Sequence, residues 1–192
     1  MFSALLDTCV LWPSLQRDFL LSLGIEGMYR PLWSTAILDE LEYEEARKLV
    51  ERGEEPTVAA RRARRLVTVM RQAFDDAEVR GWEGLDGAYG LPDPDDEHVV
   101  AASVVGGAGA IVTHNVKDFP EALVPKGIQV LLPSQFAADT VALSPTVALI
   151  AVEAIASRSG RFGSSRSVPE ILDTIDERYG MTQAVALIRP LL

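Results

Sequence analysis

The sequence is poor in the residues that form disulfides and zinc sites. Among 192 residues it contains one cysteine, Cys9, and two histidines, His98 and His114. A single cysteine excludes an internal disulfide and suits a reducing compartment. It also offers no cluster of thiolates, so we expect any metal site to use oxygen ligands rather than the sulfur ligands typical of zinc.

Basic residues are also scarce relative to acidic ones. The chain has 18 Lys and Arg against 28 Asp and Glu, which gives a formal net charge of -10. This balance excludes a protein that coats nucleic acid by bulk electrostatics, so contact with RNA would need a local basic patch. One candidate patch lies opposite the apolar stripe of a predicted helix, as either a solvated face or a contact for RNA or a partner: Arg61, Arg62, Arg64 and Arg65.

Long hydrophobic runs are absent as well. The most apolar segment, PTVALIAVEAIA, contains Glu153 and is too short to cross a bilayer. Asp7 interrupts the first apolar run early, which argues against a secretory leader. We therefore expect a soluble, cytoplasmic protein, and 48% hydrophobic residues suffice for a substantial core.

Short apolar strand segments alternate with helical patterns along the first part of the chain. This alternation predicts an α/β fold with a parallel sheet covered on both faces. No strand signal follows Phe136, so we expect a core domain over residues 1–135 and a helical C-terminal extension over residues 136–192. The basic loop SGRFGSSRS within the extension is a further candidate for RNA contact.

An unusual crowd of acids precedes a buried helix in the segment LPDPDDEHVVAASVV. Asp93 followed by Pro94 is typical of a helix N-cap with proline at the first helical position. The acids Asp95, Asp96 and Glu97 then fall in the first turn, where the helix dipole favours negative charge. Compensating a dipole needs only one or two acids, and additional ones repel each other. The cluster is thus either a capped helix end or part of a binding site.

Polar residues also follow two of the predicted buried strands. Asp7 ends the first strand, where a carboxylate is costly unless it binds a ligand or pairs with a buried arginine. Asn115 and Asp118 follow the strand that ends at Thr113, in positions that ordinary turns also favour. Because ligands of parallel sheets bind beyond the carboxyl ends of the strands, these groups predict a site at that edge.

The helix STAILDELEYEEARKLV supplies another possible acid. Ile37, Leu38 and Leu41 define its buried stripe, with Asp39 pointing away and Glu40 and Glu44 along the stripe's edge. Glu40 or Glu44 is therefore the candidate, against the alternative of a solvated acidic face.

Several carboxylates that converge without basic partners would raise one another's pKa values. A divalent cation resolves that repulsion, and oxygen ligands favour Mg²⁺, with Mn²⁺ as a substitute. The chemistry that follows is metal-assisted attack of water on a phosphodiester.

Four motifs occur in the order seen in PIN-domain proteins: LLDTCVL, STAILDEL, LPDPDDEHVVAAS and IVTHNVKDFP. Over roughly residues 3–135 the chain resembles VapC-type ribonuclease toxins of bacterial toxin–antitoxin pairs. The resemblance implies a PIN-like three-layer α/β/α sandwich. It also implies a Mg²⁺-dependent endoribonuclease that cuts tRNA or ribosomal RNA, inhibits translation, forms a homodimer and is held inactive by a cognate antitoxin.

The resemblance also assigns roles to residues. It implies four catalytic and metal-binding acids: Asp7, Glu40, Asp96 and Asp118. Many members carry an aspartate where this chain has Asn115, so Asp118 takes the last acidic role. The residues expected to support the site are Thr113, Asn115, Glu44 and Asp93. We assign Asp95 and Glu97 to the helix dipole and solvent, and expect Cys9 and the three tryptophans to pack in the core.

Two other functions remain open from the sequence. A haloacid-dehalogenase-like phosphatase also has an aspartate after its first strand, but it uses an Asp-x-Asp pair, and Cys9 occupies the second position here. A catalytically inactive PIN-like scaffold or regulatory module is the non-enzymatic alternative. The presence of Asp7, Glu40 and Asp96 counts against it, and the Asn115 departure keeps it open.

Overall fold

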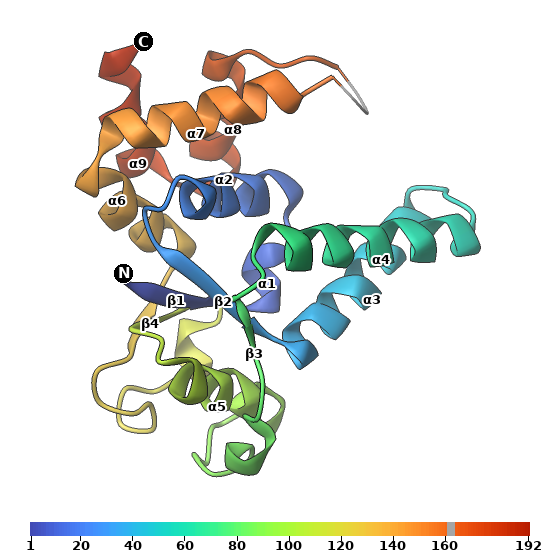
Figure 1. Cartoon of the computed structure of the whole chain (residues 1–192), viewed down its shortest axis with the longest axis vertical. Coiled ribbons are helices and arrows are strands. Elements are labelled where there is room, and N and C mark those ends of the chain that lie inside the picture. Colours follow the sequence, from blue (N-terminus) through green and yellow to red (C-terminus); the bar gives the residue numbers. More distant parts are fainter. Residues whose placement is uncertain (161–163) are drawn as a thin grey trace. The chain divides into compact units, whose positions relative to one another are not determined.

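The computed structural model describes residues 1–160 and 164–192; residues 161–163 of the basic loop SGRFGSSRS lie outside the described residues. A five-stranded sheet has the order β3-β2-β1-β4-β5 (Figure 1). Its strands are β1 (Ser3–Leu6), β2 (Arg30–Ser34), β3 (Glu78–Val79), β4 (Ala110–Val112) and β5 (Gln129–Leu131). β1 pairs with β4 and β2 pairs with β3, both in parallel, which confirms the predicted parallel sheet. The two-residue strand β3 was not predicted, because so short a segment shows no periodicity.

The helices follow the predicted order, with two additions. They are α1 (Thr8–Leu11), α2 (Ser14–Ile25), α3 (Thr35–Glu51), α4 (Pro56–Ala73), α5 (Glu97–Gly106), α6 (Pro133–Leu143), α7 (Pro145–Arg158), α8 (Val168–Tyr179) and α9 (Thr182–Ile188). Short 3-10 turns are η1 (Glu83–Leu85), η2 (Pro94–Asp96), η3 (Val116–Asp118) and η4 (Arg189–Leu191). The predictions missed α1, which is a single turn, and α6, which begins directly after β5.

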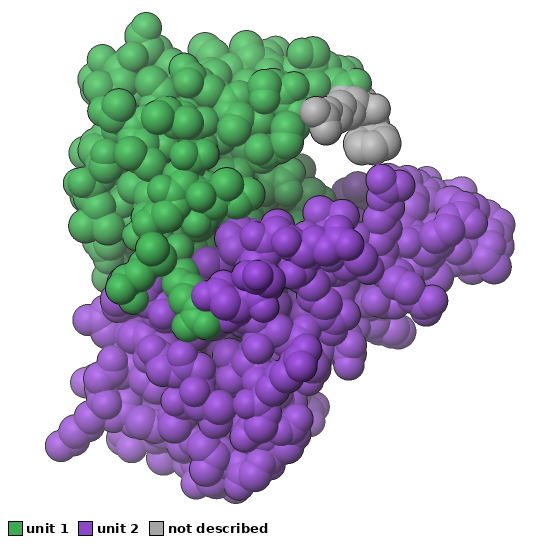
Figure 2. All heavy atoms as spheres, in the orientation of Figure 1, with its two compact units in different colours: residues 1, 13–30, 131–192 green, residues 2–12, 31–130 purple. Residues whose placement is uncertain are grey.

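Contacts divide the chain into two compact units (Figure 2). One unit contains residues 2–12 and 31–130, and the other contains residue 1, residues 13–30 and residues 131–192. In the second unit α2 packs against α7, so an early helix shares a core with the C-terminal helices. The predicted domain boundary at residue 135 stays a prediction, because the two units are defined by contacts and each combines segments from different parts of the chain.

The helical unit has its own buried centre. Tyr29 packs edge-on against Phe136, with ring centroids 4.8 Å apart, and its hydroxyl donates to the carbonyl of Leu20 at 3.0 Å. Within the described ranges, no single helix is long and apolar enough to cross a membrane. The helices α6 and α7 reach that length and composition only as a pair, and the pair bends by 116° at its break.

In the unit that carries the sheet, α3 and α4 form a hairpin (Figure 1). Ser34 caps α3 as predicted, because its hydroxyl accepts a hydrogen bond from the backbone N–H of Ile37 at 3.2 Å. Glu55 caps α4 in the same way, through the N–H of Val58 at 3.0 Å. The predicted apolar stripe of α4 is buried, and the four arginines opposite it are exposed.

The helix α5 packs against β1 and β4 and begins at Glu97, the last of the clustered acids. It ends at the C-cap Gly107, whose positive φ of 66° is typical of a glycine that stops a helix. The assignment of Glu97 to solvent was wrong. Its side chain is only 3% exposed and accepts hydrogen bonds from the N–H groups of Tyr89 at 2.8 Å and Leu91 at 2.6 Å. Glu97 therefore fixes the loop before the helix instead of facing water.

Replacing Glu97 by alanine is expected to lower the free energy of unfolding by about 2 to 4 kcal/mol, because two backbone N–H groups lose their acceptor. Asp95→Ala, at the exposed neighbouring acid, is expected to change stability by less than about 0.5 kcal/mol. Urea unfolding of the two variants measures the difference. Equal stability of the two variants would show that the loop does not depend on Glu97.

Candidate active site

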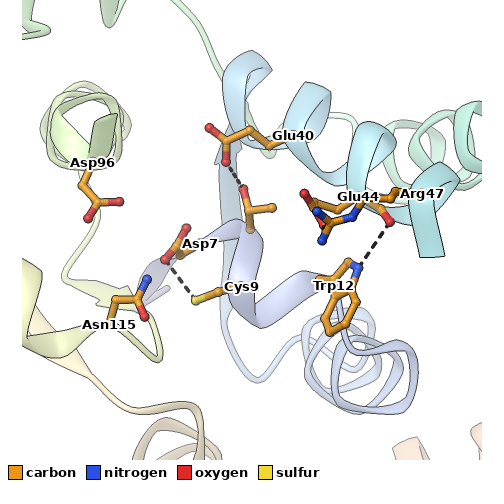
Figure 3. A pocket seen from close by; sticks show the side chains of 9 residues that line it. Asp7, Cys9, Trp12, Glu40, Glu44, Arg47, Asp96 and Asn115 are labelled. Carbon is orange, nitrogen blue, oxygen red and sulfur yellow. Dashed lines mark hydrogen bonds and ion pairs between the residues drawn. The ribbon is translucent and has the colours of Figure 1, made fainter. Parts of the chain in front are cut away.

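A pocket of about 380 Å³ opens where β1 and β4 end (Figure 3). Side chains of α1, α3, the start of α5 and the loop after β4 line it: Asp7, Thr8, Cys9, Trp12, Glu40, Glu44, Arg47, Asp96 and Asn115. β1 and β4 are neighbours in the sheet, so their carboxyl ends meet at one edge. This is the edge at which parallel sheets bind ligands, and of the polar residues predicted there Asp7 and Asn115 line the pocket.

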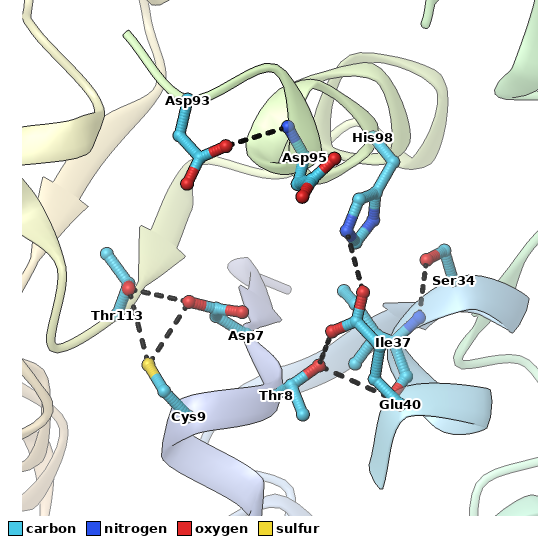
Figure 4. Close-up of polar contacts among 10 residues, drawn as sticks. All are labelled: Asp7, Thr8, Cys9, Ser34, Ile37, Glu40, Asp93, Asp95, His98 and Thr113. Carbon is cyan, nitrogen blue, oxygen red and sulfur yellow. Dashed lines mark hydrogen bonds and ion pairs between the residues drawn. The ribbon is translucent and has the colours of Figure 1, made fainter. Parts of the chain in front are cut away.

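Asp7 is the acid at the centre of this edge. It follows β1 at the start of α1, and only 6% of its surface is exposed. Its Oδ2 accepts hydrogen bonds from the hydroxyl of Thr113 at 2.6 Å and from the thiol of Cys9 at 3.1 Å (Figure 4). Within the part of the chain that the structure describes, Asp7 has no ion-pair partner, so the alternative of a salt bridge to a buried arginine does not hold.

Thr113 and Cys9 form a small network around Asp7. The hydroxyl of Thr113, fully buried, also accepts from the backbone N–H of Asn115 at 3.0 Å, while Cys9 Sγ accepts from the N–H of His114 at 3.3 Å. Burial and the negative charge of Asp7 raise the pKa of the Cys9 thiol to about 12, so the thiol stays protonated and donates. Cys9 therefore donates to the acid and is only partly buried, whereas we expected it to pack in the core.

Asp96 is the second acid of the pocket, at the N-cap position of α5. Its side chain makes no capping hydrogen bond, whereas Asp93 caps the preceding turn by accepting from the N–H of Asp95 at 3.0 Å. Burial, followed by the negative charges of Asp7, Asp93 and Asp118, raises the pKa of Asp96 to about 6. The prediction that Asp93 caps is confirmed for η2, which leads into α5, and Asp96 is left to face the pocket (Figure 3).

Glu40 and Glu44, the two candidates on α3, have different surroundings. Glu40 Oε2 accepts from the hydroxyl of Thr8 at 2.7 Å, and its Oε1 lies 3.3 Å from Nε2 of His98. Burial raises the pKa of Glu40, but the hydrogen bonds from His98 and Thr8 outweigh burial and lower it. Glu44 instead pairs with Arg47 at 2.6 Å on its own helix. Both line the pocket, and Glu40 is the one linked to the neighbouring elements.

Asn115 and Asp118 also differ in their positions relative to the pocket. Asn115 lines the pocket, and Asp118 ends η3 in a half-buried position. Asp118 lies outside the pocket lining, yet close enough for its charge to act on Asp96. The assignment of the last acidic role to Asp118 stays a prediction.

The sequence did not identify His98, Thr8, Cys9, Trp12 and Arg47 as parts of the site. Thr8 and Cys9 directly follow Asp7, and His98 follows Asp96 by two residues, so proximity to a candidate acid was the available signal. Trp33 and Trp82 are buried as expected. Trp12 is 37% exposed and lines the pocket, which corrects the expectation of a core role.

The arginines of α4 lie away from the pocket lining. Arg62 pairs with Glu54, and Arg64 lies 3.5 Å from Glu42 of α3, while all four side chains remain exposed. Two of the four predicted contact residues thus already take part in surface ion pairs, which contribute little to stability. Contact of Arg61, Arg62, Arg64 and Arg65 with RNA or a partner stays a prediction.

The donor set of the pocket fits Mg²⁺ or Mn²⁺. Within residues 1–160 and 164–192, no three acid, histidine or cysteine side chains are grouped closely enough to hold a metal by themselves. Mg²⁺ usually needs only one or two carboxylates, because it retains several waters. Asp7 and Asp96 provide two carboxylates of the right kind, and the pKa of Asp96 is raised by its burial first and then by the negative charges of the neighbouring acids.

We expect Asp96→Asn to raise the free energy of unfolding at pH 7 by about 1 to 2 kcal/mol, discounted for partial exposure. The pKa of Asp96 is about 6 in the folded protein against an ordinary 3.8, so the folded state binds more protons between these values. The free energy of unfolding therefore falls as pH rises through this window, and asparagine removes that loss. Urea unfolding in EDTA at pH 7 and pH 4 tests this, and the gain should vanish at pH 4. A less stable variant at pH 7 would contradict the expectation.

Comparison with known proteins agrees with this architecture. The family model for the PIN domain matches residues 3–117, more than half of the 192 residues. No curated protein and no solved structure matches the chain. The parallel sheet flanked by helices is that of the PIN-like α/β/α fold, and PIN domains are generally nucleases. The chain belongs to the PIN-domain family.

Proposed function

We propose that this protein is a Mg²⁺-dependent endoribonuclease and the toxin of a VapC-type toxin–antitoxin pair, which acts on tRNA or ribosomal RNA in the cytoplasm and inhibits translation. The observation that carries the proposal is the pair of carboxylates Asp7 and Asp96, which come from separate elements to one pocket without a basic partner between them. An uncompensated pair of this kind is typical of a site that binds a cation.

The acids would have different roles at the metal site, according to their positions in the pocket. Asp7 and Asp96 would hold the ion, with Glu40 and Asp118 as the further acids and Asn115 as a neutral oxygen donor in the same pocket. The bound Mg²⁺ or Mn²⁺ would orient the attacking water and neutralise charge that develops on the scissile phosphate. Thr113 holds Asp7 through its hydroxyl, which fixes the carboxylate without neutralising it.

The other end of the pocket suits a nucleotide (Figure 3). The indole of Trp12 donates to the carbonyl of Glu44 at 3.4 Å, and the ammonium of Lys48 lies 5.4 Å from the centroid of its ring. A ring held in this way offers a surface on which an unpaired base stacks. Arg47, half exposed beside it, is paired with Glu44 and Glu51 and would contact a phosphate by exchanging these partners. A local cation matters here, because the net charge of -10 repels RNA.

The same pocket suggests how the protein would be restrained. Carboxylates that lack basic partners attract guanidinium groups, so we propose that a cognate antitoxin inserts an arginine or lysine between Asp7 and Asp96. A homodimer is the oligomeric state that the family resemblance implies, and we include it in the proposal.

The main alternative is a PIN-like module without catalysis, used as a scaffold or regulator. Asn115 at an expected acidic position favours it. The phosphatase alternative loses support, because a Cys9 thiol with a pKa of about 12 cannot replace the second carboxylate as an acid–base group.

The central test is cleavage of total cellular RNA by the purified protein with Mg²⁺, with EDTA, and with Asp7→Asn. We expect discrete fragments that require Mg²⁺ and a loss of at least about 100-fold in rate with Asp7→Asn, because that change removes a ligand of the ion. Asp95→Asn is the matched control, since Asp95 is an exposed acid of the same segment outside the pocket, and it should retain activity. No cleavage with any divalent cation, by folded protein free of partners, would favour the non-catalytic module.

A second test concerns the toxin role. Induced expression of the chain in bacteria is expected to arrest growth and protein synthesis, whereas Asp7→Asn is expected to have no such effect. Co-expression of the product of the neighbouring gene should restore growth, and pull-down of that product should show a stable complex. Cleavage of RNA in vitro without any growth arrest would retain the nuclease and contradict the toxin.

A further inference from the structure

His98 links two of the acid-bearing helices. It lies on α5 two residues after Asp96, with 9% of its surface exposed. Its Nε2 lies 3.3 Å from Oε1 of Glu40 on α3, and Figure 4 shows the ring reaching from one helix to the other. Burial lowers the pKa of His98, but the hydrogen bond and charge of Glu40 outweigh burial and raise it.

The side of the imidazole that carries Nδ1 makes a ring contact but no hydrogen bond among the described residues. Its ring lies beside that of Trp82 at a tilt of 54°, with centroids 5.8 Å apart. In the described part of the chain, the buried Nδ1 has no hydrogen-bond partner. The polar interaction that fixes this ring is therefore its contact with Glu40.

In the part of the chain that the structure describes, the side chain of Glu40 accepts one other hydrogen bond, from the hydroxyl of Thr8 at 2.7 Å. Thr8 directly follows Asp7, and His98 closely follows Asp96. Thr8 and His98 thus reach Glu40 on α3 from positions beside the other two acids, Asp7 directly after β1 and Asp96 directly before α5. These contacts matter because the carboxylates of Asp7 and Asp96 repel each other, and contacts with Glu40 would hold the two segments together against that repulsion.

We propose that His98 is a positioning residue that holds the start of α5 against α3 and thereby fixes the carboxylates of Asp96 and Glu40 around the metal site. It acts through Glu40 and touches neither the ion nor the RNA. The inference rests on the proposed metal-dependent function and assigns a residue to it outside the four acids. Partners that orient metal ligands typically account for 10- to 100-fold in metal affinity.

The competing role for His98 is simple packing beside Trp82. Substitutions separate the two roles, because glutamine places an amide N–H near the position of Nε2, whereas leucine fills the space without a donor. Asparagine is shorter and places its amide near Nδ1. A positioning role therefore predicts that His98→Gln retains metal affinity and that His98→Leu and His98→Asn lose it.

The experiment is titration of Mn²⁺ into the full-length protein, followed by electron paramagnetic resonance, which needs no RNA. We expect His98→Leu to weaken Mn²⁺ binding about 10- to 100-fold and His98→Gln to stay within a few-fold of the parent protein. Thr8→Val removes the other donor to Glu40 and leaves α5 unchanged, so it should give a loss of the same kind.

A double substitution gives the decisive comparison. In a Glu40→Ala background, His98→Leu should weaken Mn²⁺ binding little further, because the acceptor through which His98 acts has already been removed. Equal losses with His98→Gln and His98→Leu, or losses that add in full to that of Glu40→Ala, would overturn the positioning role in favour of packing. If His98→Leu fails to fold by circular dichroism in EDTA, the contrast between glutamine and asparagine decides in the same way.

Failure of this inference is distinguishable from failure of the proposed function. Absence of Mn²⁺ binding by the parent protein would overturn both. Normal Mn²⁺ binding by the parent protein and by every His98 variant would overturn the positioning role and leave the nuclease proposal intact.

Discussion

The site depends on one costly feature, a buried carboxylate at the end of the first strand. Asp7 is held by a hydroxyl and a thiol, from Thr113 and Cys9, and by no cation in the described structure. Hydrogen bonds of this kind satisfy the oxygen atoms but leave the charge in place. Burial, together with the charge of Asp7, raises the pKa of Asp96 to about 6. The proposed metal ion would offset the cost of placing these carboxylates together.

The acids of the PDPDDEH segment show how neighbouring residues of one kind acquire different roles. Asp93 caps the turn, Asp95 is exposed, Asp96 faces the pocket, and Glu97 is buried under the preceding loop. The direction of each side chain from the η2 turn and the first turn of α5 sets these roles. Removing either structural acid, Asp93 or Glu97, would change where α5 begins and hence where Asp96 points.

The pocket combines two chemical halves on the unit that carries the sheet. Asp7, Asp96 and Asn115 lie at one end of it, while Trp12, Glu44 and Arg47 lie at the other (Figure 3). This arrangement suits a cation and a nucleotide phosphate side by side, as the proposed nuclease requires. The nuclease character of the family agrees with it, and the toxin role, the RNA substrate and the antitoxin belong to the proposal.

The sequence by itself determined the order of the elements and the family. Alternating apolar segments, the Ser34 cap and the Gly107 stop are local signals, because they depend on hydrophobic period and on turn and cap chemistry. The place of Asp7 at a strand end marked it as a candidate, whereas helix periodicity left Glu40 and Glu44 open, and the family resemblance selected Glu40 and Asp96.

Only the tertiary structure decided which partner each side chain takes. Glu40 meets His98 and Glu44 meets Arg47, although both acids lie on the same edge of one helix. Cys9 lies between Asp7 and Thr113, which is distant in the sequence, whereas Glu97 turns inward to the N–H groups of the loop just before it. Periodicity specifies the face of an element, and it carries no information on the element that packs against that face.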